Sequence, residues 1–380
     1  MTRVNVAFAG GGTGGHIYPG IAVREQLAAS GLLGASLYLV SQRAIDAEIL
    51  REQHLDFVAT PARSPSLRPR ALLAFLASWG KAVRASRAAL RDLKTGGGPV
   101  VMVSTGGFVS APAVQAARVE RVPVVMLNLD AVPGRANRWI AGRAARVLSS
   151  ARVANGWTQI PPIVRSAALP PGDPASCRRS LGLNPEMPVL LVTGASLGAR
   201  SINRLLLELL RRTPEAFAGW QVLHQTGDSD AEALIRAYEA AGVPAIVRPF
   251  VASMGAWWGA AEIAVARCGA GLVAEAWASR TPAVFLPYPF HKDQHQRANA
   301  LPLAEAGAAV VCEDRIDPGA NAEDAGRTLV SLLSDRAKAR KMREASLALG
   351  PVDGAARAAS AVLEVAGLSG LGTGGVNRVP

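Results

Sequence analysis

The chain carries one local pattern twice, and this repetition constrains its fold more than any other feature. Residues 4–9 form a short apolar run, a glycine-rich turn follows, and residues 17–29 have apolar side chains at helical spacing. The same order recurs in residues 189–192, in the turn at 194–200 and in residues 202–210. A strand, a glycine turn and a helix form the opening unit of a doubly wound parallel sheet. The sequence therefore predicts two such sheets.

Further strand-like runs favour the same fold class. They lie at residues 100–104, 122–127, 263–266 and 283–286, and they alternate with helix-like segments. This alternation is typical of parallel sheets with helices on both faces. We predict an α/β protein with two doubly wound, Rossmann-like domains that face each other across a cleft, with ligands at the carboxyl ends of the strands.

Proline marks the boundary between the two predicted domains. The segment 160–174 is rich in proline, which is typical of a linker. We place the N-terminal domain at residues 1–165 and the C-terminal domain at residues 166–352. Residues 353–366 predict a helix that returns to the N-terminal domain, and the glycine-rich residues 367–380 predict a flexible tail.

The composition excludes several classes of protein. With 49% apolar and 18% charged residues, the chain can bury large cores and is not intrinsically disordered. No apolar run approaches the roughly 18–20 residues of a spanning helix, so we expect no transmembrane segment. The first residues predict a strand rather than a signal peptide, which favours a cytosolic location. Cys177, Cys268 and Cys312 are far apart and odd in number, so we expect neither a disulfide framework nor a zinc site.

The positive charge is confined to the first half. Residues 1–165 hold 20 Lys and Arg against 8 Asp and Glu, whereas residues 166–380 hold 21 of each. Such asymmetry indicates that the first half meets an anionic surface or a phosphorylated substrate. Aromatic residues are only 5% of the chain and no dense lysine cluster is present, so nucleic acid is not the expected partner. An anionic lipid surface is the better candidate.

Residues 71–94 are the candidate membrane contact. On a helix, an apolar stripe from Leu72 to Leu90 would lie beside a basic face. The stripe alone is also compatible with core packing. The sharper hypothesis is that the leading end of the helix enters lipid, with these contact residues: Arg68, Arg70, Leu73, Phe75, Trp79, Lys81, Arg84 and Arg87.

Two glycine loops in the first half are candidate ligand sites. Five of the six residues from Gly10 to Gly15 are glycine, which lets backbone N–H groups approach an anion or a sugar closely. His16 follows at the start of a helix, where an imidazole can accept a proton from a hydroxyl nucleophile. The alternative is a capping or core histidine. Gly106, Gly107 and Phe108 form a second turn after a strand, and the two loops together can hold a diphosphate; a turn without a ligand is the alternative.

The second half offers a candidate donor site. Ser196 lies in a turn that opens a helix and is placed to bind a phosphate; a plain structural turn is the alternative. Glu275, at about the first turn of a later helix, can accept hydrogen bonds from a ribose diol; an exposed glutamate that stabilises the helix dipole is the alternative. Polar residues 291–299 suit sugar hydroxyls or form a surface loop. Asp228 and Asp230 precede a helix at 231–240 and are interpreted as its cap rather than as a metal site, so we expect no metal and no cofactor.

Several of these motifs together resemble one family. Residues 11–19, 104–112, 132–137, 194–200 and 291–300 occur in the order and at about the spacing seen in the MurG family of glycosyltransferase family 28, over about residues 4–365. The resemblance implies a GT-B fold and an inverting hexosyltransferase of peptidoglycan synthesis. It implies UDP-N-acetylglucosamine as donor, lipid I (undecaprenyl-diphosphate-linked muramoyl-pentapeptide) as acceptor, lipid II as product, and a peripheral place on the cytoplasmic face of the cell membrane.

The resemblance also implies roles for single residues. His16 is similar in position to the proposed base, with Thr13 beside it; Glu275 corresponds to a ribose contact and the main chain near Val251 to a uracil contact. The positions implied for UDP-N-acetylglucosamine are Gly12, Thr13, Gly14, Gly15, Asp130, Arg165, Ser196, Val251, Ala270, Glu275, His295 and Gln296. Those implied for the acceptor diphosphate are Gly14, Gly15, Gly106, Gly107 and Phe108.

Some positions depart from the family pattern. Residues 127–130 read Leu-Asn-Leu-Asp where the family usually has His-Glu-Gln-Asn, Leu197 replaces a common glutamine, and Leu272 a common threonine. Two other functions therefore stay open: a related GT-B transferase with another lipid acceptor or UDP-sugar, and a catalytically silent UDP-sugar-binding partner of cell-wall synthesis. Retention of His16 and Glu275 favours an enzyme.

Overall fold

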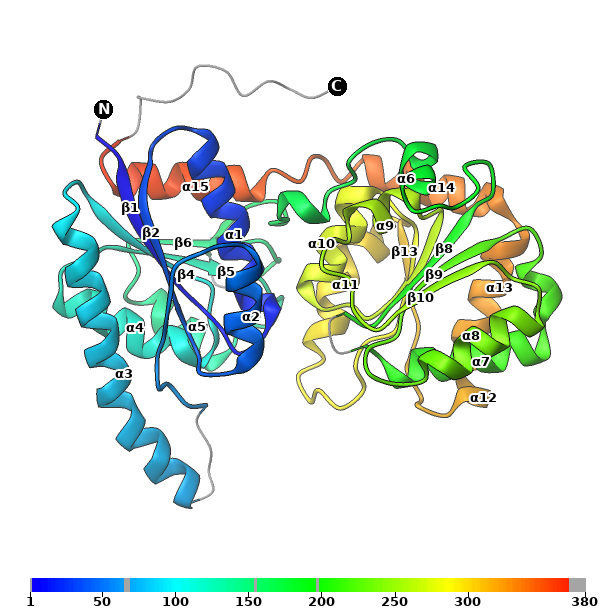
Figure 1. The fold of residues 1–380 in the computed structure, drawn as a ribbon, viewed down its shortest axis with the longest axis horizontal. Coiled ribbons are helices and arrows are strands. Elements are labelled where there is room, and N and C mark those ends of the chain that lie inside the picture. Colours follow the sequence, from blue (N-terminus) through cyan, green and yellow to red (C-terminus); the bar gives the residue numbers. More distant parts are fainter. Residues whose placement is uncertain (1, 65–68, 154–155, 196–197, 369–380) are drawn as a thin grey trace. The chain divides into compact units, whose positions relative to one another are not determined.

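The computed structural model describes residues 2–64, 69–153, 156–195 and 198–368. The chain forms two compact units (Figure 1). The N-terminal unit comprises residues 1–129, 133–165 and 353–380, and the C-terminal unit comprises residues 130–132 and 166–352. The chain therefore leaves the first unit after Arg165 and returns to it at Asp353.

The N-terminal unit is built on a seven-stranded sheet in the order β3-β2-β1-β4-β5-β6-β7, and neighbouring strands are parallel throughout. The strands are β1 (Val4–Ala9), β2 (Leu33–Val40), β3 (Phe57–Ala59), β4 (Val100–Ser104), β5 (Val124–Asn128), β6 (Arg146–Ser149) and β7 (Thr158–Gln159). The helices are α1 (Gly14–Ala29), α2 (Ala44–Glu52), α3 (Pro69–Thr95), α4 (Gly107–Val119), α5 (Arg135–Ala141) and α15 (Gly354–Val365).

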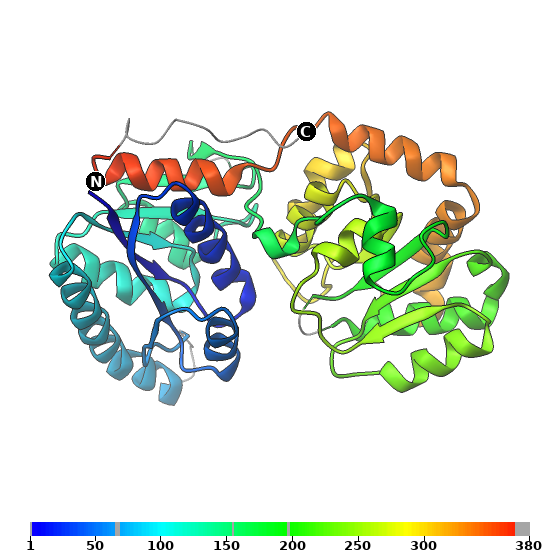
Figure 2. The same cartoon turned by 45° about the horizontal axis from the view of Figure 1, so that its top comes forward.

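Helices cover both faces of this sheet. One apolar cluster joins β1, β4 and β5 to α1, α2 and α15, and another joins the same sheet to α3, α4 and α5. Helix α15 packs beside α1, so the last described helix completes the core of the first unit (Figure 2). Because both faces are covered, β1, β4 and β5 are buried along their whole length and are mostly apolar, with Asn5, Ser104 and Asn128 as the polar exceptions.

The C-terminal unit repeats this architecture on a six-stranded parallel sheet in the order β10-β9-β8-β11-β12-β13. The strands are β8 (Val189–Thr193), β9 (Gln221–Gln225), β10 (Ala245–Arg248), β11 (Ile263–Ala266), β12 (Ala283–Phe285) and β13 (Ala309–Val311). The helices are η1 (Ser166–Ala168), α6 (Pro174–Ser180), α7 (Arg200–Arg212), η2 (Pro214–Phe217), α8 (Ala231–Ala240), α9 (Gly255–Ala260), α10 (Ala270–Ser279), α11 (His295–Glu305), α12 (Pro318–Asn321), η3 (Ala322–Gly326), α13 (Arg327–Ser334) and α14 (Arg336–Leu347).

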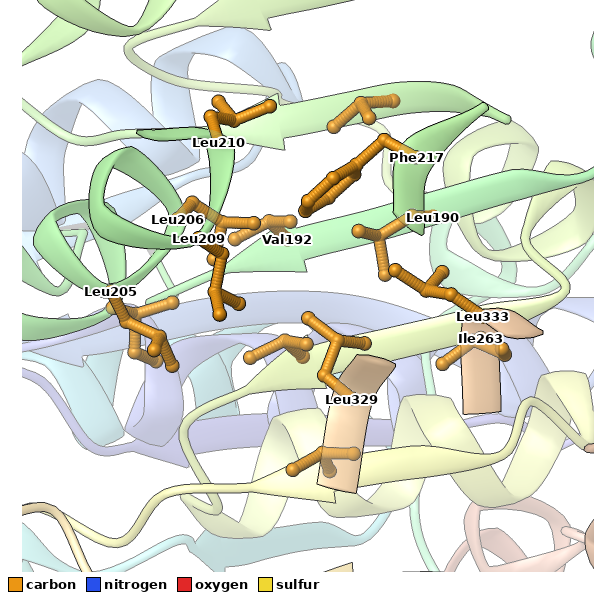
Figure 3. Close-up of a cluster of buried hydrophobic side chains, with 14 of the residues drawn as sticks. Leu190, Val192, Leu205, Leu206, Leu209, Leu210, Phe217, Ile263, Leu329 and Leu333 are labelled. Carbon is orange, nitrogen blue, oxygen red and sulfur yellow. The ribbon is translucent and has the colours of Figure 1, made fainter. Parts of the chain in front are cut away.

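Two apolar clusters again cover the two faces of the sheet. Figure 3 shows the cluster in which leucines of α7 and α13 pack on β8 and β11 together with Phe217. The opposite face carries α6, α9, α10 and α11, with Trp258 fully buried among them. The predicted fold class, two doubly wound α/β units, is confirmed. All three cysteines are buried and free, as expected.

Helix α3 has two different halves. Its second half contributes Ala89, Leu90 and Leu93 to the core, whereas Leu72, Leu73 and Leu76 near its start are exposed. Its leading end extends beyond the body of the N-terminal unit (Figure 1). The expected apolar stripe is therefore core packing only in the second half of the helix. In the described part of the chain, no helix combines the length and apolar content needed to cross a bilayer.

Candidate active site

The strand order places the two predicted glycine loops at the topological switch point of the first sheet. After β1 the chain continues to β2 on one side, and after β4 it continues to β5 on the other side, while β1 and β4 pair with each other. Ligands of doubly wound folds bind at such a switch point, beside the carboxyl ends of the two strands. Both predicted loops, Gly10–Gly15 and Gly106–Phe108, follow these two strands. In the second sheet, β8 and β11 form the equivalent pair.

A buried carboxyl group holds the first loop in place. Both oxygens of Asp46 accept from the backbone N of Gly12, at 2.9 and 2.8 Å, and Oδ2 also accepts from the N and Oγ of Ser41. Asp46 is fully buried at the start of α2. Sequence reasoning missed this residue, because its role depends on how α2 approaches the first loop and not on a local pattern. Asp46 binds the protein's own backbone instead.

The imidazole of His16 is fixed by one hydrogen bond. His16 lies in the first turn of α1, and its Nδ1 is 3.1 Å from the carbonyl oxygen of Thr105. A carbonyl oxygen can only accept, so Nδ1 carries a proton, and in the neutral ring Nε2 is then the bare, proton-accepting nitrogen. The Thr105 hydroxyl in turn donates to the carbonyl of His16. The two loops at the switch point therefore hold the ring in the tautomer that a general base needs.

The second loop approaches His16 so closely that it requires glycine. Gly107 has φ +79°, and a Cβ there would lie 3.1 Å from Cδ2 of His16 and 3.2 Å from the carbonyl oxygen of Gly11. Gly106 likewise has φ +91° and abuts the side chain of Asn137. The guanidinium carbon of Arg43 lies over the ring of Phe108, 5.5 Å from the centre of that ring. Arg43 also donates to the carbonyl of Gly12 at 2.7 Å, so the second loop is tied to the first.

The remaining predicted residues of the N-terminal unit lie around α1. Thr13 and Gly15 are exposed at its start, while Gly14 is buried. Arg165 is buried at the end of the unit, with its guanidinium carbon 4.0 Å from the ring centre of Tyr18 on α1. The predicted residues of this unit therefore lie in one region around the start of α1. They are Gly12, Thr13, Gly14, Gly15 and His16 of the first loop and helix, Gly106, Gly107 and Phe108 of the second loop, and Arg165.

In the C-terminal unit, Glu275 is positioned by a tryptophan. The Nε1 of Trp258 donates to Oε2 of Glu275 at 2.7 Å, and Glu275 is half-buried. The glutamate lies in the second turn of α10, whose first residue is Ala270, rather than in its first turn. Val251 is half-buried just before α9, the helix that carries Trp258. Trp258 had no signal in the sequence, because the tryptophan and Glu275 meet only through the packing of α9 against α10.

The segment between β12 and α11, together with the first residue of α11, carries a group of rings in contact with one another. The ring of His291 lies 4.8 Å from that of Tyr288 and 4.2 Å from that of His295. Burial and the neighbouring His295 lower the pKa of His291, which favours its neutral form. Nδ1 of His295 pairs with Asp293 at 2.8 Å, and this bond lowers the pKa of the Asp293 carboxyl.

Gln296 and Asp130 complete the same region. The backbone N of Tyr288 donates to Oε1 of Gln296 at 2.9 Å, which orients the amide and leaves its Nε2 N–H groups to donate to a ligand. Asp130 accepts from Nδ2 of Asn299 at 2.9 Å, and Oδ1 of Asn299 accepts from the backbone N of Ala131. Three of the predicted residues thus lie together: His295 and Gln296 begin α11, and Asp130 binds Asn299 of the same helix.

Two predicted residues, Ser196 and Arg68, lie outside the described residues, as does Leu197. Helix α8 begins at Ala231 as predicted, but Asp230 has φ +66° and its side chain does not cap the helix. Instead Oδ2 accepts from Nδ2 of Asn203 at 3.4 Å. Asp230 therefore occupies the predicted cap position, but with its left-handed backbone the side chain makes no capping hydrogen bond, and that part of the prediction was wrong.

The basic face of α3 is partly neutralised. Arg87 and Arg91 both bind Oε1 of Glu120, at 2.8 and 3.1 Å, and these bonds lower the pKa of Glu120. Lys81 and Arg84 are exposed. Trp79 donates to Gln115 at 2.6 Å and contacts Phe75 edge to face. Among the predicted contact residues, Arg87 therefore already has a carboxylate partner.

Fold and site together define the class of protein. Two doubly wound units, each on its own parallel sheet, are the GT-B architecture. A MurG from Acinetobacter baumannii has the same fold, with a TM-score of 0.71 and 23% identity over 96% of this chain and 100% of that one. A UDP-N-acetylglucosamine 2-epimerase is similar in fold at a TM-score of 0.63 and 16% identity, over 96% and 97% of the two chains.

Sequence comparison defines the family. Residues 6–149 match the glycosyltransferase family 28 N-terminal domain, and residues 189–354 match its C-terminal domain. Two similar relatives, from Geobacter metallireducens and Xylella fastidiosa, are both named UDP-N-acetylglucosamine--N-acetylmuramyl-(pentapeptide) pyrophosphoryl-undecaprenol N-acetylglucosamine transferase. They are 31% and 36% identical, over 93% and 94% of this chain and 96% and 95% of theirs. The chain belongs to glycosyltransferase family 28, in the MurG family that its motifs resemble.

Proposed function

We propose that the protein transfers N-acetylglucosamine from UDP-N-acetylglucosamine to the muramoyl 4-hydroxyl of lipid I, with inversion, to give lipid II. The names of its relatives support both substrates. The single structural observation that supports the chemistry best is the bond from Nδ1 of His16 to the carbonyl of Thr105, because it leaves Nε2 as a base. On this proposal the N-terminal unit binds the acceptor and the C-terminal unit binds the donor.

The proposed reaction assigns one task to each group. Nε2 of His16 takes the proton of the acceptor hydroxyl, the oxygen forms a bond to the anomeric carbon, and the bond from that carbon to UDP breaks. The departing diphosphate gains negative charge, which Arg165 and the backbone N–H groups at the start of α7 stabilise. Gln296 donates to the transferred sugar through Nε2, and Glu275, oriented by Trp258, accepts from the ribose hydroxyls.

A transfer assay tests this function. Purified protein with UDP-N-acetylglucosamine and a short-chain lipid I analogue is expected to release UDP and form the lipid-linked disaccharide. His16→Ala is expected to lower kcat by about 10²-fold or more. His54→Asn, at an exposed histidine of the same unit, is the control and is expected to keep full activity. Binding of the donor without hydrolysis or transfer would instead support the silent partner, and transfer to diacylglycerol would support another lipid acceptor.

We further propose that the leading half of α3 places the protein on an anionic membrane surface, at the cytoplasmic face of the cell membrane. Leu73 and Leu76 are exposed there, with Lys81 and Arg84 one to three turns further along the helix. Each basic residue near anionic lipid contributes about 1 kcal/mol of binding.

Liposome sedimentation tests this surface. Lys81→Glu with Arg84→Glu is expected to weaken sedimentation with anionic vesicles at least 10-fold, by the same arithmetic. Arg236→Glu with Arg327→Glu makes the same change in net charge on the C-terminal unit and is the matched control. Equal sedimentation of the two double variants would reject the assignment to α3.

A further inference from the structure

One buried arginine connects four segments at the carboxyl edge of the second sheet. Arg267 directly follows β11 and is 9% exposed. Its Nη1 donates to the carbonyl oxygens of Leu286 and Pro287, at 2.9 and 3.2 Å, and to Oδ2 of Asp314 at 2.6 Å. Its Nη2 donates to Oγ of Ser201 at 2.8 Å, in the first turn of α7. The guanidinium thus connects the segments that follow β11, β12 and β13 with the first turn of α7.

The partner carboxylate of this arginine is also fully bonded. Oδ2 of Asp314 accepts from the Ser201 hydroxyl, and Oδ1 accepts from Nδ2 of Asn321 and from the backbone N of Ile316. Burial acts to raise the pKa of Asp314, but the hydrogen bonds from Ser201 and Asn321 and the charge of Arg267 outweigh it and lower the pKa. A buried, charge-assisted pair whose carboxylate is bonded on both oxygens holds the segments that it joins in a defined geometry.

The hydrogen bonds of Arg267 connect it to Gln296, the residue proposed to bind the sugar. Arg267 fixes the carbonyl oxygen of Pro287, and the next residue, Tyr288, donates its backbone N to Oε1 of Gln296. The guanidinium also lies 5.7 Å from the ring centre of Tyr288, whose ring contacts His291. Through Ser201, the same guanidinium fixes the start of α7. One side chain therefore sets the relative position of the diphosphate end and the sugar end of the proposed donor site.

We propose that Arg267 is a positioning residue for the sugar diphosphate of the donor. It holds the first turn of α7 and the segment that carries Gln296 at the spacing of a nucleoside diphosphate sugar, without itself touching the ligand. This inference rests on the proposed function. It assigns no contact of Arg267 to the uridine, because Val251 and Glu275 lie on other segments, before α9 and on α10.

The opposite edge of the same sheet supplies a matched control. Arg178 is 6% exposed, and it binds the carbonyl oxygens of Ala260 and Pro185 and the carboxylate of Glu262 at 3.1 Å. Pro185 and Glu262 lie before β8 and β11, and Ala260 is the last residue of α9. Arg178 therefore has burial and bonding like those of Arg267 at a place where no diphosphate or sugar contact is proposed.

Ligand titration separates positioning from general stabilisation. Affinities of the full-length protein for UDP-N-acetylglucosamine, UDP and UMP are measured by calorimetry or by competition, together with Tm. Arg267→Lys keeps the charge but loses the fork, and it is expected to weaken UDP-N-acetylglucosamine binding about 10-fold while UMP affinity changes less than about twofold. Arg178→Lys is expected to lower Tm similarly and to leave all three affinities unchanged. Ser201→Ala, a smaller change, is expected to weaken UDP and UDP-N-acetylglucosamine binding and to remain folded.

The outcomes distinguish this inference from the proposed function. Tight binding of UDP-N-acetylglucosamine by wild type, Arg267→Lys and Ser201→Ala alike would overturn the positioning role alone. So would an equal loss for UMP and the sugar nucleotide, or the same loss in Arg178→Lys, because either indicates a general structural effect. Absence of binding by the wild-type protein would overturn the proposed function and this inference with it.

Discussion

The close approach of Gly107 to His16 gives the sharpest test of the first-unit geometry. In Gly107→Ala the backbone keeps φ +79°, which costs a non-glycine residue about 1–2 kcal/mol. The new methyl carbon lies 3.1 Å from Cδ2 and 3.4 Å from Nε2 of His16, below the roughly 3.5–4.0 Å of an optimal contact. The imidazole must therefore shift by about 0.5 Å, which strains its bond to Thr105.

The expected result is a loss of activity beyond the loss of stability. We expect kcat to fall about 10-fold or more, since a displacement of about 1 Å at a reacting group costs up to about 10²-fold. Gly31→Ala is the matched control: Gly31 follows α1, has φ +72°, and a Cβ there meets nothing within 4 Å. Both variants are expected to lower Tm by a few degrees, about 2–4 °C per kcal/mol. Equal kcat in the two variants would refute the argument that Gly107 controls the position of His16.

Two further predictions concern buried polar groups. Asp46→Ala removes the acceptor of Gly12 and Ser41 and is expected to lower the free energy of unfolding, measured in urea, by about 3 kcal/mol. Asp92→Ala, at an exposed position, is the control and is expected to change this free energy by less than about 0.5 kcal/mol. An equally small effect of Asp46→Ala would contradict the role of Asp46 in holding the loop. Burial lowers the pKa of His224 to about 3, so between about pH 6.5 and pH 3 only the unfolded chain binds a proton at this residue. The free energy of unfolding is therefore expected to decrease as the pH is lowered through this range, by up to about 1.4 kcal/mol per pH unit. His224→Gln should remove that contribution to the slope, and an unchanged slope would show that His224 is not buried in its neutral form.

Local pattern was enough to predict the elements that carry the loops. The strand at residues 4–9 was predicted with the bounds that β1 has, and the strand at residues 263–266 with those of β11. The first helix begins at Gly14, three residues before its predicted start, because glycines at 14 and 15 carry no apolar signal although they continue the helix. Period and glycine spacing therefore predict which segments form a site, with errors at helix ends.

Interactions between distant segments could not be predicted in the same way. The pairing of Arg87 and Arg91 with Glu120 joins α3 to the end of α4, and the bond from Trp258 to Glu275 joins α9 to α10. The acceptor role of Asp46 depends on how α2 approaches the first loop. Each contact arises from tertiary packing between residues 17 to 34 positions apart, which neither helical nor strand periodicity encodes.

The tautomer of His16 is the most direct test of the proposed mechanism. Nitrogen-15 NMR of protein labelled in its histidines, assigned with His16→Ala, reports which ring nitrogen carries the proton. For the neutral ring, the hydrogen bond to Thr105 predicts a proton on Nδ1 and a bare Nε2, with or without UDP. A proton on Nε2 in the neutral ring would contradict the assignment of this nitrogen as the base.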